Sequence, residues 1–230
     1  MATPLTLVNV TLDYPDGSSA IKALDSVNLS ANAGEFLSLV GPSGSGKSSL
    51  LAVAATLVTP TSGLVLIDGQ DATALGAGER TALRRETVGI IFQQPNLLSS
   101  LTAVEQLVIG EHLRGKPLRA ARRRAAELLD VVGLADGLNK RPHQLSGGQR
   151  QRVNIARALM GSPRVLLVDE PTAALDMERS EAIVRLLRRV TDEFSTATLM
   201  VTHDTEFLPL TDSVLTMRDG RLGAAVSTAA

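Results

Sequence analysis

Short alternating runs of apolar and polar residues open the chain. Residues 5–14 (LTLVNVTLDY) and 21–30 (IKALDSVNLS) flank the sequence PDGSS. Alternation with a period of two is typical of strands that bury one face, and a cluster of Pro, Asp, Gly and Ser favours a turn. The pattern predicts antiparallel strands and a hairpin within residues 1–35.

Further along, continuous apolar runs alternate with amphipathic helical patterns. The apolar runs predict buried strands at residues 35–40, 64–71, 164–170 and 196–204, and a short strand pair at 213–223. Helical spacing of apolar residues predicts helices at residues 47–58, 151–160 and 178–194. Strands that alternate with helices indicate an α/β fold whose sheet is largely parallel and covered on both faces.

The composition changes between residues 94 and 145. This stretch is rich in Ala, Leu, Arg and Glu, which favour helices, and it predicts helices at residues 106–115 and 118–134. We interpret it as a helical subdomain inserted into a single domain, 1–230, whose core consists of residues 1–93 and 146–230.

Two segments carry weaker patterns. The arginines at 122–124 have acidic neighbours and lie in an alanine-rich helical pattern, which favours a solvated face over a lipid or nucleic-acid patch. The final residues, 224–230 (AAVSTAA), are small and mostly apolar, and we expect them to be loosely held.

The overall composition narrows the class of protein. The chain is 44% hydrophobic and 20% charged, an ordinary globular balance. A net charge of -1 and 2% aromatic residues disfavour a nucleic-acid-binding protein, and the absence of Cys excludes disulfides and thiolate metal sites. The start has no signal-peptide pattern, and the longest apolar stretch, 50–58, is far shorter than the ~20 residues that span a bilayer. We therefore expect a soluble chain that reaches a membrane only through a partner.

A phosphate-binding motif follows the strand predicted at 35–40. The sequence GPSGSGKS fits G-x-x-x-x-G-K-[ST] and lies between a predicted strand and a predicted helix. Its glycines let backbone N–H groups converge on a phosphate, Lys47 would reach the β- and γ-phosphates, and Ser48 would bind Mg²⁺. The residues expected to hold the nucleotide are Gly41, Pro42, Ser43, Gly44, Ser45, Gly46, Lys47, Ser48 and Ser49.

Two acids end the predicted strand at 164–170. An apolar strand that ends in Asp169 presents a carboxylate at the sheet edge, where Mg²⁺ beside the phosphates could be met. Glu170, one position on, can polarise the attacking water as a general base. Paired acids after a strand are also common turn residues, but the phosphate loop upstream favours the catalytic interpretation.

A second glycine-rich motif, LSGGQ at 145–149, directly precedes a predicted helix. Ser146 is a good N-cap, and two glycines leave the helix N-terminus open to an anion. This motif cannot easily serve the nucleotide held by Gly41–Ser48, because the helical subdomain stands between them. The residues in question are Ser146, Gly147, Gly148 and Gln149.

These ordered motifs, over nearly the whole chain, resemble the ATP-binding cassette (ABC) ATPases, a family with a P-loop NTPase core, an N-terminal antiparallel β subdomain and an inserted α-helical subdomain. The resemblance implies that LSGGQ is the signature motif and that AALD (173–176) crosses a dimer interface. It further implies that Tyr14 stacks on adenine, that Gln93 contacts Mg²⁺ and water and links the lobes, and that His203 senses the γ-phosphate.

The resemblance also completes the expected site. It implies ATP and Mg²⁺ as cofactors; the expected catalytic residues are Glu170, His203 and Gln93, and the expected metal ligands are Ser48, Gln93 and Asp169. Gln94 is a neighbouring candidate for the glutamine, but Gln93 fits the family pattern better. One departure is the segment 52–59 (AVAATLVT), where relatives often carry a Gly-containing turn, and we expect it to affect packing rather than chemistry.

The family's arrangement implies partners. Two copies would form a homodimer, with each ATP between Gly41–Ser49 of one chain and Ser146–Gln149 of the other. An integral membrane permease would contact the helical subdomain near Asn96–Thr102 and hold the ATPase at the cytoplasmic face of the cell membrane. No nucleic-acid partner is expected.

The segment 83–107 further resembles the macrolide-export, lipoprotein-release and haem-export group. This likeness implies an ATPase that powers export of a hydrophobic or amphipathic substrate, such as haem, an antibiotic, an antimicrobial peptide or a lipoprotein. An importer subunit and a soluble, non-transport ABC ATPase remain the alternatives.

Overall fold

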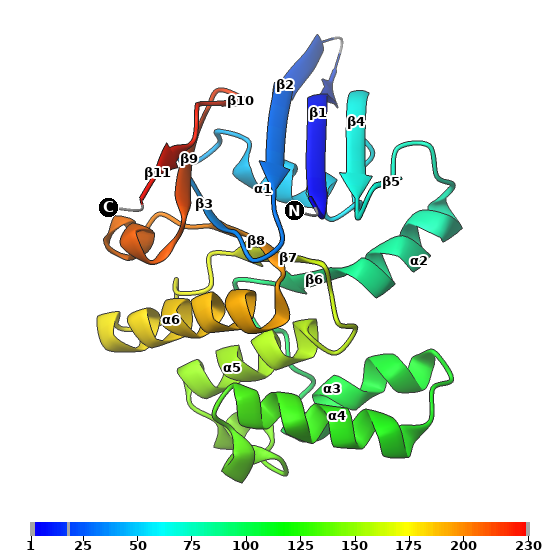
Figure 1. Cartoon of the computed structure of the whole chain (residues 1–230), viewed down its shortest axis with the longest axis vertical. Coiled ribbons are helices and arrows are strands. Elements are labelled where there is room, and N and C mark those ends of the chain that lie inside the picture. The colour runs from blue at the N-terminus through cyan, green and yellow to red at the C-terminus, as the bar shows by residue number, and fades with distance from the viewer. Residues whose placement is uncertain (1–2, 18, 229–230) are drawn as a thin grey trace.

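The alternating N-terminal segments form a long β-hairpin, as predicted (Figure 1). The computed structural model describes residues 3–17 and 19–228. The hairpin belongs to a four-stranded antiparallel sheet in the order β2-β1-β4-β5. Its strands are β1 (Leu5–Asp16), β2 (Ser19–Ala31), β4 (Ser62–Ile67) and β5 (Gln70–Asp71).

A second sheet has the order β10-β9-β3-β8-β7-β6. The five strands from β9 to β6 run parallel to their neighbours, which confirms the predicted parallel sheet. The strands are β3 (Phe36–Val40), β6 (Val88–Ile91), β7 (Val165–Asp169), β8 (Ala197–Val201), β9 (Ser213–Arg218), β10 (Arg221–Leu222) and β11 (Val226–Ser227).

The C-terminal segment is more ordered than its composition predicts. β11 pairs antiparallel with β9, with Val226 opposite Val214. The Thr228 amide also donates a hydrogen bond to the Asp212 carbonyl at 3.1 Å. The expectation of a loosely held tail is therefore wrong for residues 226–228, because an edge strand of the sheet offers them backbone partners; residues 229 and 230 lie outside the described part of the chain.

Each central parallel strand contributes to two hydrophobic cores. In β7, Val165 and Leu167 belong to the core shared with the antiparallel sheet, whereas Leu166 and Val168 belong to the core shared with the helices. Successive side chains of a strand point to opposite faces, so a strand covered on both faces is apolar at every position. This explains the continuous apolar runs in the sequence.

The helix after the phosphate loop is shorter than predicted. α1 (Lys47–Ala54) ends before residue 58, and Thr56 adopts a left-handed conformation with φ 55°. Its carbonyl accepts a hydrogen bond from the Arg84 guanidinium at 3.1 Å. This turn lies in the segment where a glycine was expected, and a β-branched residue there costs about 1–2 kcal/mol of conformational energy.

One helix escaped prediction. α2 (Ala77–Thr87) is largely polar, and Leu83 is its one buried residue among those described. The Glu79 carboxylate accepts a hydrogen bond from the Gly76 amide at 2.9 Å, which stabilises the N-terminus of the helix. A helix held mainly by its cap carries little apolar periodicity.

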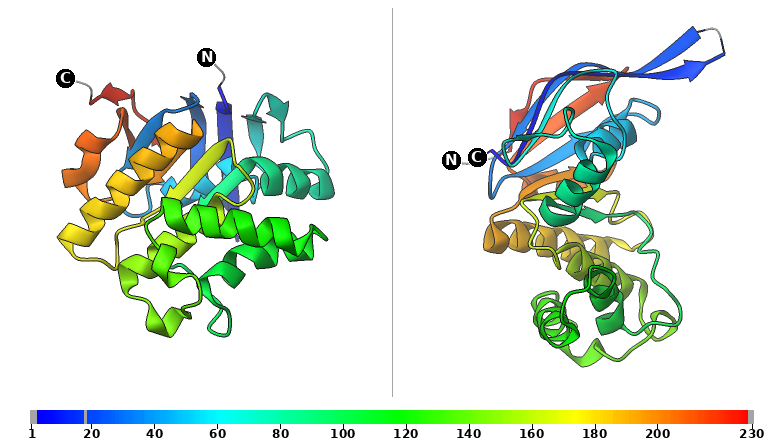
Figure 2. Two further views of the ribbon diagram at one scale, coloured as in Figure 1. Left: turned by 60° about the horizontal axis from the view of Figure 1, so that its bottom comes forward. Right: turned by 90° about the vertical axis from the view of Figure 1, so that its right-hand side faces the viewer.

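The helical segment lies at the end of the molecule opposite the hairpin (Figures 1 and 2). α3 and α4 pack as an antiparallel pair against α5, and α5 and α6 cover one face of the parallel sheet. Their bounds are α3 (Ala103–Leu113), α4 (Leu118–Val131), α5 (Gly147–Ala158) and α6 (Met177–Phe194), with 3₁₀ turns at Ala135–Gly137, Pro142–Gln144 and Thr205–Leu210. Within residues 3–17 and 19–228, no helix is both long and apolar enough to cross a bilayer.

Candidate functional site

The phosphate loop connects β3 to α1 in a conformation that requires glycine. Gly41 has φ 153° and Gly46 has φ 105°. A Cβ atom on Gly41 would lie 2.1 Å from the Met217 carbonyl oxygen, and one on Gly46 would lie 2.4 Å from the Ala23 carbonyl oxygen. The loop therefore packs directly on neighbouring backbone and can curl there only without side chains.

Lys47 lies at the start of α1 and bends back over the loop. Its ammonium donates hydrogen bonds to the carbonyls of Gly41 and Pro42, both at 2.8 Å. These contacts hold a positive charge beside the N-terminus of α1, where the helix dipole also attracts anions. The arrangement suits a phosphate group.

A cavity of 830 Å³ opens above the loop. It is lined by residues 41, 43, 44 and 46–49, together with Tyr14, Glu170 and His203, whereas Pro42 and Ser45 do not face it. The structure thus brings the phosphate loop together with Tyr14 and with the pair Glu170 and His203, which are far apart in the sequence. Sequence reasoning missed further lining residues, which come from β2 and from the turn after β9: Ile21, Lys22, Ala23, Asp219 and Gly220.

Tyr14 lies at one side of this cavity, on β1. Its ring is 40% exposed, and it pairs across the hairpin with Ile21, which is 58% exposed. An exposed aromatic ring beside an exposed aliphatic side chain forms an apolar platform, which suits a flat, weakly polar group such as a nucleobase.

Three predicted residues meet at the end of β7. The Gln93 amide nitrogen donates a hydrogen bond to the Glu170 carboxylate at 3.3 Å, and His203 Nδ1 lies 3.4 Å from the other Glu170 oxygen. Glu170 itself has φ 43°, and its amide donates to the Val201 carbonyl at 3.0 Å. A strained, hydrogen-bonded backbone holds this carboxylate toward the cavity, which is a common device at functional sites.

Asp169 is half-buried beside Glu170. Burial raises the pKa of its carboxyl, and the negative charge of Glu170 raises it further, while Lys47 acts in the opposite direction. A nearby cation would stabilise the ionised form of such a carboxylate.

The residues expected to bind Mg²⁺ offer suitable atoms. Ser48 supplies a hydroxyl, Asp169 a carboxylate and Gln93 an amide oxygen, and these are the oxygen ligands that Mg²⁺ prefers beside phosphates. The raised pKa of Asp169 fits a cation in the same place. The described residues contain no cluster of three or more His, Cys, Asp or Glu that could hold a metal ion by themselves. The three residues therefore fit a Mg²⁺ ion that is bound partly by their side chains and partly by phosphate oxygens.

The second glycine-rich motif lies elsewhere. Ser146 caps α5: its hydroxyl accepts from the Gln149 amide at 3.2 Å, and its own amide donates to the Gln149 side chain at 2.9 Å. Ser146 is exposed, and none of the described residues that line the 830 Å³ cavity comes from Ser146–Gln149. Within the single chain, the two glycine-rich motifs do not line one cavity.

Side chains of α5 connect this helix to the backbone on both sides of Gln93. Asn154, fully buried, donates to the Phe92 carbonyl at 2.9 Å. Arg157 donates to the Pro95 carbonyl at 2.7 Å and to the Asn154 side-chain oxygen at 2.9 Å. Burial lowers the pKa of the Arg157 guanidinium. Sequence reasoning missed both residues, because their partners are 62 residues away along the chain.

A third side chain holds the next part of this segment. The Gln106 amide is buried and forms three hydrogen bonds with the backbone of Leu98 and Leu101. The residues 96–102 are nevertheless largely exposed, including Leu98 at 52%. The segment is a surface feature with a fixed backbone.

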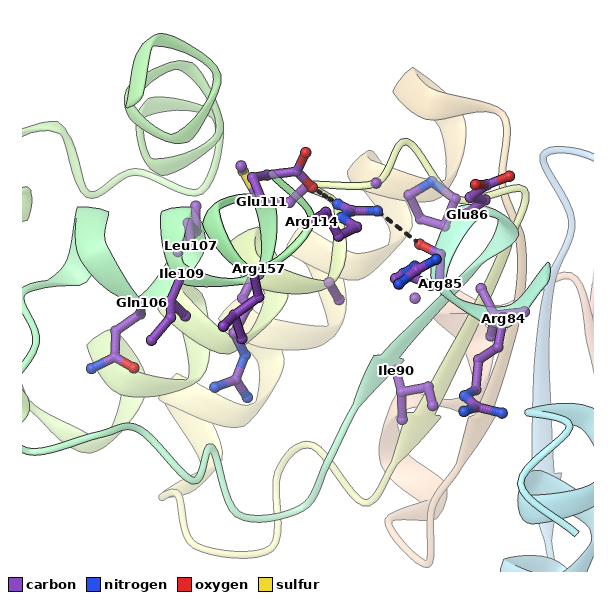
Figure 3. Close-up of a pocket in the computed structure, with 18 of the residues that line it drawn as sticks. Arg84, Arg85, Glu86, Ile90, Gln106, Leu107, Ile109, Glu111, Arg114 and Arg157 are labelled. Carbon is purple, nitrogen blue, oxygen red and sulfur yellow. Dashed lines mark hydrogen bonds and ion pairs between the residues drawn. The ribbon is translucent and has the colours of Figure 1, made fainter. Parts of the chain in front are cut away.

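A second cavity, of 580 Å³, adjoins this segment (Figure 3). Arg84 and Ile90, from α2 and β6, lie across from Gln106 and Arg157, from α3 and α5. Arg114 closes one side through an ion pair with Glu111 and a hydrogen bond to the Arg85 carbonyl. The cavity thus lies between the sheet and the helical segment, well away from the phosphate loop.

Together, the parallel sheet, the glycine-rich loop at the start of α1 and the carboxylates at the end of β7 define a phosphate-loop ATPase. A family model described as "ABC transporter" matches residues 24–173. The chain belongs to the ABC transporter family, and it is an ABC ATPase domain, as the ordered motifs indicate.

Individual relatives agree with this assignment. The chain is 41% identical to the lipoprotein-releasing system ATP-binding protein LolD of Shewanella frigidimarina, over 97% of this chain and 94% of the relative. It is 43% identical to the macrolide export ATP-binding/permease protein MacB 1/2 of Paracoccus denitrificans, over 98% of this chain. The chain spans about a third of the length of this macrolide exporter, namely 34%.

Solved structures share the fold. The ATP-binding cassette MJ0796, described as a dimer in a post-hydrolysis state with ADP and Pi, is 38% identical with a TM-score of 0.87, over 98% of this chain and 99% of that chain. CbiO1 of Clostridium perfringens, described as part of the ABC transporter complex cbiONQ, is 29% identical with a TM-score of 0.89, over 99% and 90%. The predicted α/β fold is confirmed.

Proposed function

We propose that this ATPase powers the export of a hydrophobic or amphipathic substrate through a membrane permease, and that it lies at the cytoplasmic face of the membrane through that permease. The observation that carries the proposal is the near full-length likeness to LolD, a lipoprotein-releasing ATP-binding protein, together with the macrolide exporters. The substrate itself would be chosen by the permease.

The 830 Å³ cavity is the proposed ATP site. Tyr14 would stack on the adenine, and the backbone N–H groups of Gly41–Ser49 would hold the phosphates, with Lys47 against the β- and γ-phosphates. Ser48, Gln93 and Asp169 would hold Mg²⁺, which supplies charge neutralisation on the phosphate oxygens.

Glu170 is the proposed general base. Its carboxylate faces the cavity and would accept a proton from the water that attacks the γ-phosphorus, while the bond to the β-phosphate oxygen breaks. The contacts from Gln93 and His203 orient the two carboxylate oxygens. His203 would report the presence of the γ-phosphate, because it lines the same cavity.

We further propose that the site is completed by a second copy of the chain. Ser146–Gln149 lie outside the cavity of their own chain, and the related cassette MJ0796 is described as dimeric. The exposed N-terminus of α5 would close over the ATP of the partner. Ser146→Arg should leave ATP binding by one chain intact but block dimer formation and hydrolysis; unchanged ATPase activity would contradict the shared site.

The permease would contact the segment Asn96–Thr102 and the adjoining 580 Å³ cavity. This surface is largely exposed and has a fixed backbone, and the residues just before it, Phe92 and Pro95, are bonded to α5 through Asn154 and Arg157. Movement of the helical segment on ATP binding would therefore reach the permease directly.

The absence of Cys allows a direct test of this contact. Ser99→Cys places one thiol on the exposed segment, and Ser30→Cys places one on the exposed face of β2 as a matched control. In membranes from the native host, Ser99→Cys should form a cross-link to an integral membrane protein and the control should not. The identity of the cross-linked protein decides the direction of transport, since an importer permease would overturn export, and a purely soluble partner would overturn transport.

A further inference from the structure

The connection between α3 and α4 carries an unusual concentration of positive charge. Between residues 112 and 126 the sequence has six Arg or Lys residues and no Asp or Glu, although the whole chain has a net charge of -1. In Figure 1 this connection lies at the edge of the molecule, at one end of the α3–α4 pair. We call its exposed part the basic tip; it consists of Leu113, Lys116, Leu118, Arg119, Arg122 and Arg123.

The stability of the fold does not explain these cations. Arg119 and Arg122 have no ion-pair partner within the described part of the chain, and Arg123 has a long, exposed contact to Glu127 at 3.7 Å. They lie in the first half of α4, which has no acidic residue in its first turn and no side-chain cap. Positive side chains near a helix N-terminus oppose the helix dipole, so they weaken the helix.

Exposed leucines lie among these cations. Leu113 is 80% exposed, the highest value among the exposed large hydrophobic residues, and Leu118 is 43% exposed. Leu118 also lines a shallow hollow of 190 Å³ together with Val108 and Ile109. Glu105 also lines this hollow and is the one acidic residue among the described residues that line it; it lies within electrostatic range of Arg122. Apolar side chains among mainly basic residues are typical of surfaces that lie in the interfacial layer of a membrane.

The base of the tip is held firmly. The Gly115 amide donates to the His112 carbonyl at 2.9 Å, and Lys116 pairs with the buried Glu111 at 3.1 Å. Arg114 joins the same carboxylate to the backbone of Arg85, near the end of α2. The charge of Glu111 is therefore neutralised inside the protein, while the tip presents its cations and leucines outward.

We propose that the basic tip binds anionic lipid headgroups, with the guanidinium groups on the phosphates and Leu113 and Leu118 in the interfacial layer. This differs from the solvated face at 122–124 and from the partner-mediated membrane contact that the sequence led us to expect, because the exposed leucines become apparent only in the structure. Lipid fits better than nucleic acid, since residues 105–130 contain no Phe, Tyr or Trp side chain on which a base could stack. It fits better than an acidic peptide, because the hollow at the tip has no Arg or Lys among the described residues that line it, so the cations do not line a groove. The proposal goes beyond the proposed function, as binding to lipid requires neither ATP nor a permease.

The test is sedimentation of the full chain with vesicles. The chain should bind vesicles of phosphatidylcholine mixed with phosphatidylglycerol, and should not bind pure phosphatidylcholine; raising the salt concentration should weaken the binding. Arg119→Gln with Arg122→Gln should lower the affinity about twenty-five-fold, since each basic residue near an anionic surface contributes roughly fivefold. Arg185→Gln with Arg218→Gln, which removes the same charge from exposed positions elsewhere, is the control.

The leucines are tested in the same way. Leu113→Ala should weaken binding several-fold, whereas Leu57→Ala, at another exposed leucine, should not. The thermal midpoint of the Arg119 and Arg122 variant should not fall, because the changes remove charges that oppose the helix dipole.

Three outcomes would overturn the lipid proposal. The first is equal binding of the chain to neutral and to anionic vesicles. The second is equal affinity of the tip variant and the control variant for anionic vesicles. The third is that the native chain binds no vesicles while the tip variant loses its association with the permease. The last result would assign the tip to a protein contact. Loss of ATPase function in other experiments would leave the vesicle result unchanged, so the two proposals fail separately.

Discussion

Gln106 anchors the surface segment that follows Gln93, and replacing it isolates the energy of that anchor. Its side-chain oxygen accepts from the Leu98 amide at 3.1 Å, and its nitrogen donates to the carbonyls of Leu98 at 2.6 Å and Leu101 at 3.1 Å. Gln106→Leu keeps a side chain of similar size in the same buried position but removes all three hydrogen bonds.

The expected cost follows from these contacts. Each hydrogen bond contributes about 1 kcal/mol net, so three contribute about 3 kcal/mol. Leu98 is 52% exposed as a residue, so we expect its backbone groups to regain water, which spares the larger penalty of an unpaired buried group; the leucine side chain that replaces Gln106 gains about 1 kcal/mol from apolar burial. We expect a net loss of about 2 kcal/mol, or a fall in thermal midpoint of about 4–8 °C for a chain of this size.

Gln151 provides a matched control. It is as buried as Gln106, at 2% exposure, but its side-chain nitrogen has no partner within the described residues. Gln151→Leu should therefore leave the free energy of unfolding unchanged or raise it slightly. The two variants make the same chemical change and differ only in the hydrogen bonds that they remove.

The assays are thermal unfolding and hydrogen exchange. In Gln106→Leu the Leu98 amide should exchange faster, while ATP affinity should stay the same, since no described residue lining the ATP cavity comes from 94–102. The reasoning is wrong if both glutamine variants lose equal stability, or if exchange at Leu98 is unchanged.

Three further substitutions test the site. Glu170→Gln should retain ATP binding and lower turnover by about 10²–10⁴-fold, measured by phosphate release, because a general base is lost; undiminished hydrolysis would remove Glu170 from that role. Lys47→Ala should weaken ATP binding in a titration, and equal affinity would argue against its phosphate contact. Asp169→Asn should raise the unfolding midpoint of the nucleotide-free chain at neutral pH but not at acid pH, because burial raises the pKa of Asp169 and its ionised form destabilises the fold; a midpoint gain that persists at acid pH would refute this cause.

Local patterns predicted most of the fold. The period-two alternation of residues 5–14 specified the hairpin, and the apolar run at 164–170 specified β7, because strand periodicity depends on neighbours along the chain. α2 escaped prediction since it buries little apolar surface, and α1 ended early because the chain turns at Thr56. The early end of α1 involves a distant contact, from Arg84 to the Thr56 carbonyl, whereas α2 is stabilised by a local cap that apolar periodicity does not reveal.

Some parts of the candidate site were likewise predictable from local sequence, and others were not. Residues 41–49 are contiguous, so their sequence was sufficient to predict a phosphate loop. The contacts of Asn154 and Arg157, and the presence of Ile21 in the ATP cavity, depend on how distant segments meet. Nothing in the local sequence indicates the left-handed backbone that presents Glu170.

The hydrogen bonds of Asn154 and Arg157 have a thermodynamic consequence. They join α5, whose N-terminus carries Ser146–Gln149, to the backbone on both sides of Gln93. A displacement of α5 therefore changes the position of Gln93, and a displacement of Gln93 changes the position of α5. If Gln93 and Ser146–Gln149 contact the nucleotide as proposed, a ligand that favours one arrangement of α5 changes the ATP affinity by some factor. By reciprocity, ATP must change the affinity for that ligand by the same factor. Measuring either affinity with and without the other ligand therefore gives the coupling free energy of the cassette from both directions, and the two values must agree.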